Sequence, residues 1–171
     1  MFSFLKRDTV DKDAARRWRD AVTAEARLPE PFLKGWITDT IYGRFNMVTL
    51  VATLAMRRLR DEGKEGLALS KAFSELLFSD FDHALRENGV GDSSIARRIR
   101  KMGEEFYGVA KAIDEALDMG GPQVHVADVI KRNSIQLDEQ KALDLASHII
   151  ALSERVERLP ESAILKGPDA L

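Results

Sequence analysis

The chain has 171 residues, of which 44% are hydrophobic and 32% charged, and its formal net charge is −2. These values fit one soluble globular domain with a core of its own, and they give no general affinity for nucleic acid or for an anionic bilayer. The absence of cysteine excludes disulfides and thiolate metal ligands. The most apolar run, residues 45–56, is well short of the roughly 20 residues that span a membrane.

The first residues contain no pattern typical of a targeting segment. Few apolar residues precede Lys6, whereas the apolar part of a secretory signal needs roughly 7–15. Acidic residues follow at once, at Asp8, Asp11 and Asp13, and transit peptides are poor in them. We therefore expect a cytoplasmic protein that is at most peripheral to a membrane.

The hydrophobic pattern has a helical period, and no segment alternates as a strand does. It predicts six helices, over residues 11–27, 38–61, 67–88, 93–119, 122–133 and 138–159. The expected N-caps are polar residues that open these segments, namely Asp11, Thr38 or Asp39, and Asp138. Residues 28–36 contain two prolines and predict an irregular link, and residues 160–171 predict a loose tail.

Two of these helices define the expected core. The second is apolar around most of its circumference, which is typical of a central helix. Its polar residues form one narrow stripe: Asn46, Thr49, Thr53, Arg57 and Arg60. The fourth has a stripe with spacings of three and four: Ile95, Ile99, Met102, Phe106, Val109, Ile113 and Leu117. The sequence thus predicts a single all-α domain, with a core at 30–120, a helical extension at 121–159 and a tail at 160–171.

A glycine-rich corner separates the third and fourth predicted helices. Gly89 lies where a helix C-cap takes a left-handed residue, and Val90 can supply the apolar contact that accompanies such a cap. Gly91 leaves room for a close approach or a positive φ, and Asp92 is the expected N-cap of the next helix. Within the third helix, Asp82 and Arg86 are four residues apart and are expected to pair.

Four cations follow this corner within five residues: Arg97, Arg98, Arg100 and Lys101. The helix macrodipole disfavours cations near a helix N-terminus, so local stability does not require them. They form either a solvated face or a basic patch for an acidic partner, phosphate or RNA.

Two blocks of the sequence resemble a known family. The first is "ITDTIYGRFNMVTL" at residues 37–50, and the second is "FSDFDHALRENGVGDSSIARRIRKM" at residues 78–102, followed by "FYG" at 106–108. In their order and spacing they resemble the ubiquinol–cytochrome c chaperone family. The resemblance implies an all-helical, non-enzymatic assembly factor for the cytochrome bc1 complex, with no catalytic residues, cofactor, metal or DNA partner. It further implies a membrane-protein client such as newly made cytochrome b, contact with the ribosome or a small partner protein, and a place at the inner membrane.

We expect partner-binding residues on both sides of the corner: Arg44, Asp80, Asp82, Arg86, Glu87, Asp92, Arg97, Arg98, Arg100 and Lys101. They are expected to form one docking surface, over a groove between the second, third and fourth predicted helices. Arg44 lies at the edge of an apolar helix, and an unpaired buried charge is costly. We therefore predict that it pairs with Asp80, Asp82 or Glu87.

Two other functions remain open at this stage. Asp80, His83 and Glu87 share one helix face, and carboxylate–histidine pairs build di-iron sites in helical bundles, so a metalloprotein or oxidoreductase is an alternative. Such a site needs a second pair of this kind, and only one has the right spacing. The broad apolar face of residues 45–56 favours, as a third hypothesis, a peripheral lipid- or quinone-binding protein.

Overall fold

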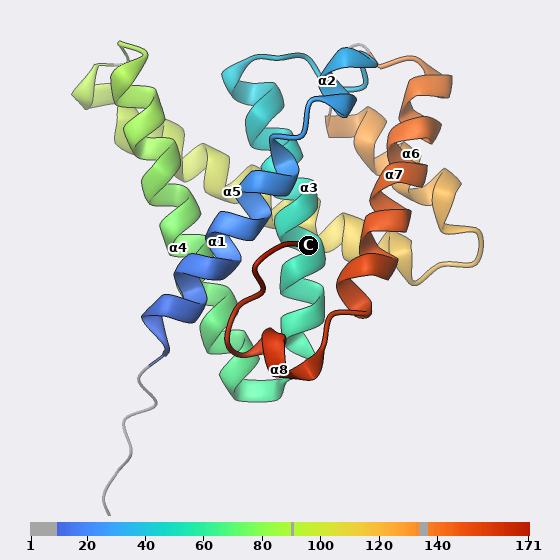
Figure 1. The fold of residues 1–171 in the computed structure, drawn as a ribbon. Helices are drawn as coiled ribbons and strands as arrows, with labels where there is room; N and C mark the ends of the chain where they lie inside the picture. The colour runs from blue at the N-terminus through green and yellow to red at the C-terminus, as the bar shows by residue number, and fades with distance from the viewer. Residues whose placement is uncertain (1–9, 90, 134–136) are drawn as a thin grey trace, which may run out of the picture.

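The computed structural model of the protein describes residues 10–89, 91–133 and 137–171, which contain helices and no strand. The helices are α1 (Lys12–Ala26), α2 (Glu30–Leu33), α3 (Ile41–Arg60), α4 (Gly63–Glu87), α5 (Asp92–Leu117), α6 (Pro122–Asn133), α7 (Glu139–Glu157) and α8 (Glu161–Ile164) (Figure 1). The predicted all-α bundle is confirmed. None of the helices within the described residues combines the length and the apolarity needed to cross a bilayer.

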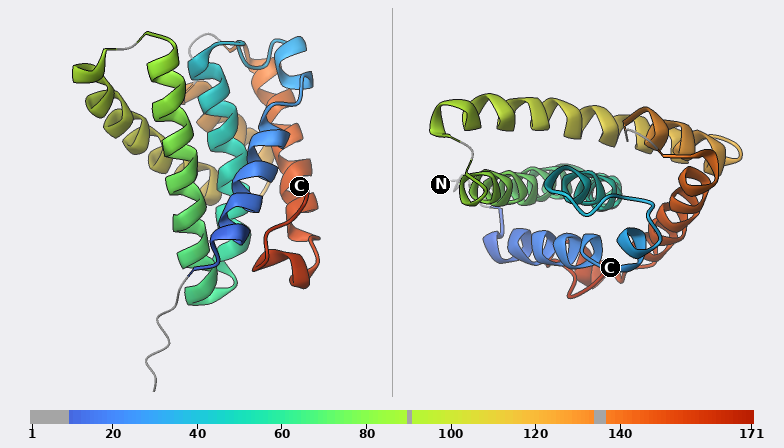
Figure 2. Two further views of the ribbon diagram at one scale, coloured as in Figure 1. Left: turned by 60° about the vertical axis from the view of Figure 1, so that its left-hand side comes forward. Right: turned by 90° about the horizontal axis from the view of Figure 1, so that it is seen from above.

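The helices lie in layers around α3. Seen from above, α3 and α4 form a middle layer, α1 lies on one side of it and α5 on the other, and α6 and α7 close one end (Figure 2). Phe45, Met47 and Leu54 of α3 are buried, as expected for a central helix. Its buried hydroxyls bond within the helix, because Thr49 Oγ1 donates to the carbonyl of Phe45 at 2.9 Å.

The C-terminal part of the polar stripe on α3 forms ion pairs with acidic side chains at the C-terminal end of α5. Arg57 donates to Asp114 at 2.7 Å and to Asp118 at 2.6 Å, and Arg60 also bonds to Asp114. The hydrogen bond to Asp118 is the largest of the effects that raise the pKa of Arg57. A cation on an otherwise apolar helix is thus matched by carboxylates from its neighbour.

Helix boundaries differ from the predictions in three places. The link over residues 28–36 contains the single turn α2, with Pro31 in its first turn. Thr40, not Thr38 or Asp39, caps α3, and its hydroxyl accepts from the backbone N–H of Gly43 at 3.0 Å. The helix α4 begins at Gly63, four residues earlier than predicted.

The C-terminal residues are packed, so the prediction of a loose tail at 160–171 was wrong. The indole N–H of Trp18 donates to the carbonyl of Ile164 at 2.8 Å, and Ile164 is fully buried. Gly167 and Pro168 are buried as well. A buried indole needs an acceptor, and here the acceptor comes from a segment 146 residues away that has no helical period of its own.

The corner between α4 and α5 confirms one expectation and corrects two. Gly89 has φ of 77° and its N–H donates to the carbonyl of Arg86, as in a helix C-cap. Gly91 has φ of −64°, and a Cβ atom added there would meet nothing within 4 Å, so it shows neither the positive φ nor the close approach that we predicted as alternatives. It also occupies the N-cap position that we predicted for Asp92. Val90 lies outside the described residues.

Candidate functional site: two pockets beside the start of α3

The first turn of α3 is packed against the loop that precedes it. A Cβ atom added to Gly43 would lie 1.8 Å from the carbonyl oxygen of Thr38 and 3.0 Å from the side chain of Ile37. Only glycine allows this approach, and the cap from Thr40 holds the same turn from the other side. The residues that carry the family resemblance therefore fix the shape of the chain where α3 begins.

A groove lies between this turn of α3, the end of α1 and the end of α4. We call it the α1–α3–α4 groove, and it has a volume of about 540 Å³. Its floor is apolar and includes Phe45, Val48, Leu77 and Phe81. The rings of Phe45 and Phe81 meet edge to face, with centroids 5.0 Å apart. These contacts give the groove a firm aromatic floor.

The rim of the groove is charged. Arg44 donates to Asp39 at 2.7 Å, so its predicted pairing with Asp80, Asp82 or Glu87 was wrong. This hydrogen bond lowers the pKa of Asp39 and raises that of Arg44. Asp39 lies five residues away along the chain, which lets the pair form locally. Both residues remain more than half exposed, so the pair is available to a partner.

The predicted carboxylates of α4 are engaged in other pairs. Asp80, which also lines the groove, accepts from Arg19 of α1 at 2.9 Å. Asp82 pairs with Arg86 at 2.7 Å, as predicted.

The third carboxylate, Glu87, lies 3.2 Å from His83 on the exposed face of α4. The described part of the chain contains no group of three or more His, Asp or Glu side chains arranged to hold a metal ion. Asp80 thus pairs with Arg19, while His83 and Glu87 contact each other.

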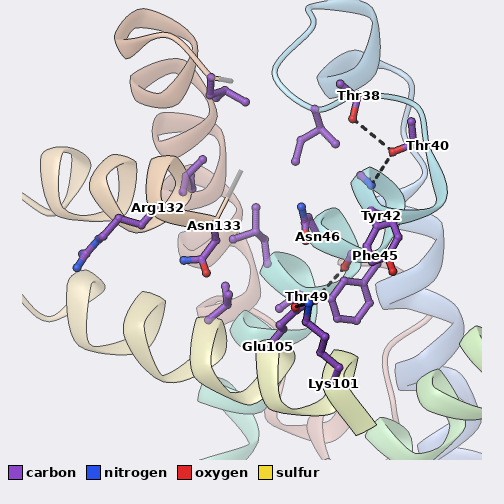
Figure 3. Close-up of a pocket in the computed structure, with 16 residues that line it drawn as sticks. Thr38, Thr40, Tyr42, Phe45, Asn46, Thr49, Lys101, Glu105, Arg132 and Asn133 are labelled. Carbon is purple, nitrogen blue, oxygen red and sulfur yellow. Dashed lines mark hydrogen bonds and ion pairs between the residues drawn. The ribbon is translucent and has the colours of Figure 1, made fainter. Parts of the chain in front are cut away.

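A second pocket lies on the opposite side of α3, and the sequence did not indicate it as a pocket. We call it the α3–α5–α6 pocket, with a volume of about 590 Å³. Figure 3 shows the polar side chains that surround it: Asn46 and Thr49 of α3, Lys101 and Glu105 of α5, and Arg132 and Asn133 of α6. Asn46 and Thr49 belong to the polar stripe on α3, which was the available signal for this pocket.

The predicted site residues are divided between the two pockets and the outer faces of α4 and α5. Arg44 and Asp80 line the α1–α3–α4 groove, whereas Lys101 lines the α3–α5–α6 pocket. Arg97 and its basic neighbours are on α5, across the α3–α4 layer from α1 (Figure 2). Each of these two pockets uses only two of the second, third and fourth predicted helices, together with α1 or α6, so a docking surface shared by all the predicted residues stays a prediction.

Comparison with known proteins agrees with this arrangement of helices. The family model described as "Ubiquinol-cytochrome C chaperone" matches residues 35–169. The chain belongs to the ubiquinol–cytochrome c chaperone family. The match extends well beyond residue 120, so α6, α7 and the packed C-terminal segment are part of the region that the family shares.

A solved structure is similar over nearly the whole chain. It is described as the crystal structure of the Cbp3 homolog from Brucella abortus, with 26% sequence identity and a TM-score of 0.81. The match covers 94% of this chain and 90% of that one. No curated protein matches the chain. Family and fold together support a role in assembly of the cytochrome bc1 complex.

Proposed function

We propose that the protein is a non-enzymatic assembly chaperone that holds an apolar segment of a newly made bc1 subunit, such as cytochrome b, in the α1–α3–α4 groove. The observation that carries the proposal is the apolar floor beneath a charged rim. A groove of about 540 Å³ falls in the range of roughly 300–1,000 Å³ typical of ligand pockets, so it can take several apolar side chains but not a whole helix.

The geometry favours recognition of one face of a client helix. Helix-in-groove complexes insert apolar side chains spaced by three and four residues between flanking helices. The floor residues Phe45 and Phe81 supply apolar contact area, while Arg44 and Asp80 at the rim can pair with polar groups that flank the segment. Burial of apolar surface would supply the binding affinity, and pairing with the charged rim would fix the position of the client segment along the groove.

Other predicted partner residues lie outside this groove. We assign Asp82, Arg86 and Glu87, on the outer face of α4 beside the corner, to contact with a second protein such as a small partner protein or the ribosome. The protein would act on the cytoplasmic side of the inner membrane, where a membrane subunit is inserted. No step of this function requires catalysis or a cofactor.

The proposal is tested by filling the groove. Ala84 lines it from α4, and Ala84→Trp places a large side chain there. Ala151→Trp, at an exposed position of α7, is the matched control. We expect wild type and Ala151→Trp to copurify bc1 subunits from their own cells and Ala84→Trp to lose them. Equal recovery by both variants, with both folded, would count against the groove as the client site.

A further inference from the structure

The outer face of α5, near the corner, carries four cations, with the exposed Ala96 before them and the exposed Glu104 and Glu105 one turn further on. Arg97, Arg98, Arg100 and Lys101 are exposed, and at about 100° per residue they cover one arc of the helix. The opposite side of the same turns is buried and includes Ile95, Met102 and Phe106. We call the four cations the α5 basic face. Its three arginines are exposed and outside the core, and Lys101 also lines the α3–α5–α6 pocket.

Most of the α5 basic face is unpaired. Lys101 lies 3.6 Å from Glu105, but no acidic side chain among the described residues pairs with Arg97, Arg98 or Arg100. Arg44 pairs with Asp39 and Arg57 with Asp114, whereas Arg17 and Arg27 resemble the three arginines of α5 in having no carboxylate partner among the described residues. The three arginines therefore keep their full hydrogen-bonding capacity for a partner.

Folding does not account for this cluster. Arg97 is three residues from Arg100 and four from Lys101, and Arg98 is three from Lys101. Like charges at these spacings repel each other along a helix and destabilise it. A cluster that opposes the stability of its own helix is a candidate for a binding surface, and its charge calls for an anionic partner.

We propose that the α5 basic face docks onto the headgroups of an anionic bilayer. The face lies on the outer side of a single helix, where it can meet a surface of phosphates, and arginine binds phosphate oxygens in a bidentate manner. Single-stranded RNA is instead held by aromatic side chains that stack on bases. The nearest exposed aromatic residue on α5 is Tyr107, and its ring packs against Phe106 and Phe78, with centroids 5.1 and 6.3 Å apart.

Docking in this way would orient the chaperone. The α4–α5 corner lies at the same end of the bundle as the end of α1 and the start of α3 (Figures 1 and 2). The α1–α3–α4 groove is lined at that end by Arg27, Thr40 and Asn88. Because α1 and α5 lie on opposite sides of the α3–α4 layer, docking would hold the groove on the side of the bundle that faces away from the headgroups (Figure 2). This orientation rests on the proposed function, whereas bilayer binding itself rests only on the α5 basic face.

The test is flotation of the full chain with vesicles. We expect binding to phosphatidylcholine vesicles that contain phosphatidylglycerol, no binding to pure phosphatidylcholine, and loss of binding as salt rises, since the interaction is screened. Arg97→Gln/Arg98→Gln/Arg100→Gln should lower the partition coefficient by roughly a hundredfold, because each of the three basic residues contributes about fivefold at an anionic surface. The matched control carries the same change of charge at exposed lysines near the other end: Lys12→Gln/Lys64→Gln/Lys71→Gln.

The control should bind vesicles nearly as wild type does, and the arginine variant should unfold at the same or a slightly higher temperature. Absence of binding by wild type at low salt, or equal losses in the two triple variants, would overturn the proposal. Binding of single-stranded RNA through the same arginines, without vesicle binding, would overturn it too. The chaperone proposal is tested separately, by recovery of bc1 subunits with the arginine variant in detergent, where no bilayer is present. Recovery there means that a failure to bind vesicles does not count against client binding.

Discussion

Replacement of Gly43 by alanine tests how the start of α3 is built. A Cβ atom at this position would lie 1.8 Å from the carbonyl oxygen of Thr38, and no real Cβ contact is that short. Either the loop before α3 must move, or the first turn of the helix must open. Both changes disturb the wall of the α1–α3–α4 groove, because Asp39 and Thr40 lie in the segment that must move.

The direction of the change in stability of Gly43→Ala shows whether helix propensity or overpacking dominates at this position. Helix propensity alone favours alanine over glycine by up to about 1 kcal/mol, which predicts a more stable protein. Overpacking against a backbone atom costs about 1–3 kcal/mol or more, which predicts a less stable one. The collision involves a carbonyl and not a flexible side chain, so we expect the second effect to win, with a net loss of about 1–2 kcal/mol.

Gly108→Ala is the matched control for this prediction. Gly108 is also helical, in α5, and an added Cβ would meet nothing within 4 Å. We expect its melting temperature to rise by up to about 4 °C and that of Gly43→Ala to fall by about 2–8 °C, since 1 kcal/mol corresponds to about 2–4 °C at this size. Thermal unfolding by circular dichroism measures both. If Gly43→Ala is as stable as Gly108→Ala, the close approach of the loop to α3 is not present in solution.

Three further predictions concern other contacts. Trp18→Phe removes the hydrogen bond to the carbonyl of Ile164, so a buried carbonyl loses its donor. The free energy of unfolding in urea denaturation should fall by about 1–3 kcal/mol. An unchanged denaturation midpoint would mean that the C-terminal segment is not docked. Arg57→Met should cost about 1–3 kcal/mol in the same assay, because the side chain is only 21% exposed and its loss leaves Asp118 without its partner and Asp114 with Arg60 alone. A gain in stability would contradict this. Arg44 lowers the pKa of Asp39, so the pair stabilises the fold above the ordinary value of 3.8, and this stabilisation is lost as pH falls through the lowered pKa. Asp39→Asn should thus melt below wild type at neutral pH and together with it in strong acid, and a gap that persists in acid would refute the assignment.

The helices and their buried faces were predictable from the sequence because their signals are local. The stripe on α5 with spacings of three and four leaves one side to bury, and Ile95, Met102, Phe106 and Ile113 are indeed buried. The cap at Asp138 was likewise predictable, because its carboxylate accepts from a backbone N–H only three residues along the chain.

The groove and the tail were not predictable, because they depend on contacts between distant segments. Nothing in the sequence of residues 160–171 indicates that this segment packs against Trp18. The partner of Arg44 was missed for a different reason: several carboxylates were candidates, and Asp39, only five residues away, forms the pair locally while Arg19 binds Asp80. Ion-pair partners are set by three-dimensional distance, which a single sequence does not contain.

The central claim is that a bc1 membrane subunit binds in the α1–α3–α4 groove. The most direct measurement is photo-crosslinking in cells, with a photoreactive amino acid at Thr23 on the α1 wall, at Ala84 on the α4 wall, or at Ala151 on α7 as the control. We predict an adduct with cytochrome b or another bc1 membrane subunit from Thr23 and Ala84 and none from Ala151. Adducts from Ala151 alone, or no adduct from either wall in cells that assemble the complex, would contradict the account.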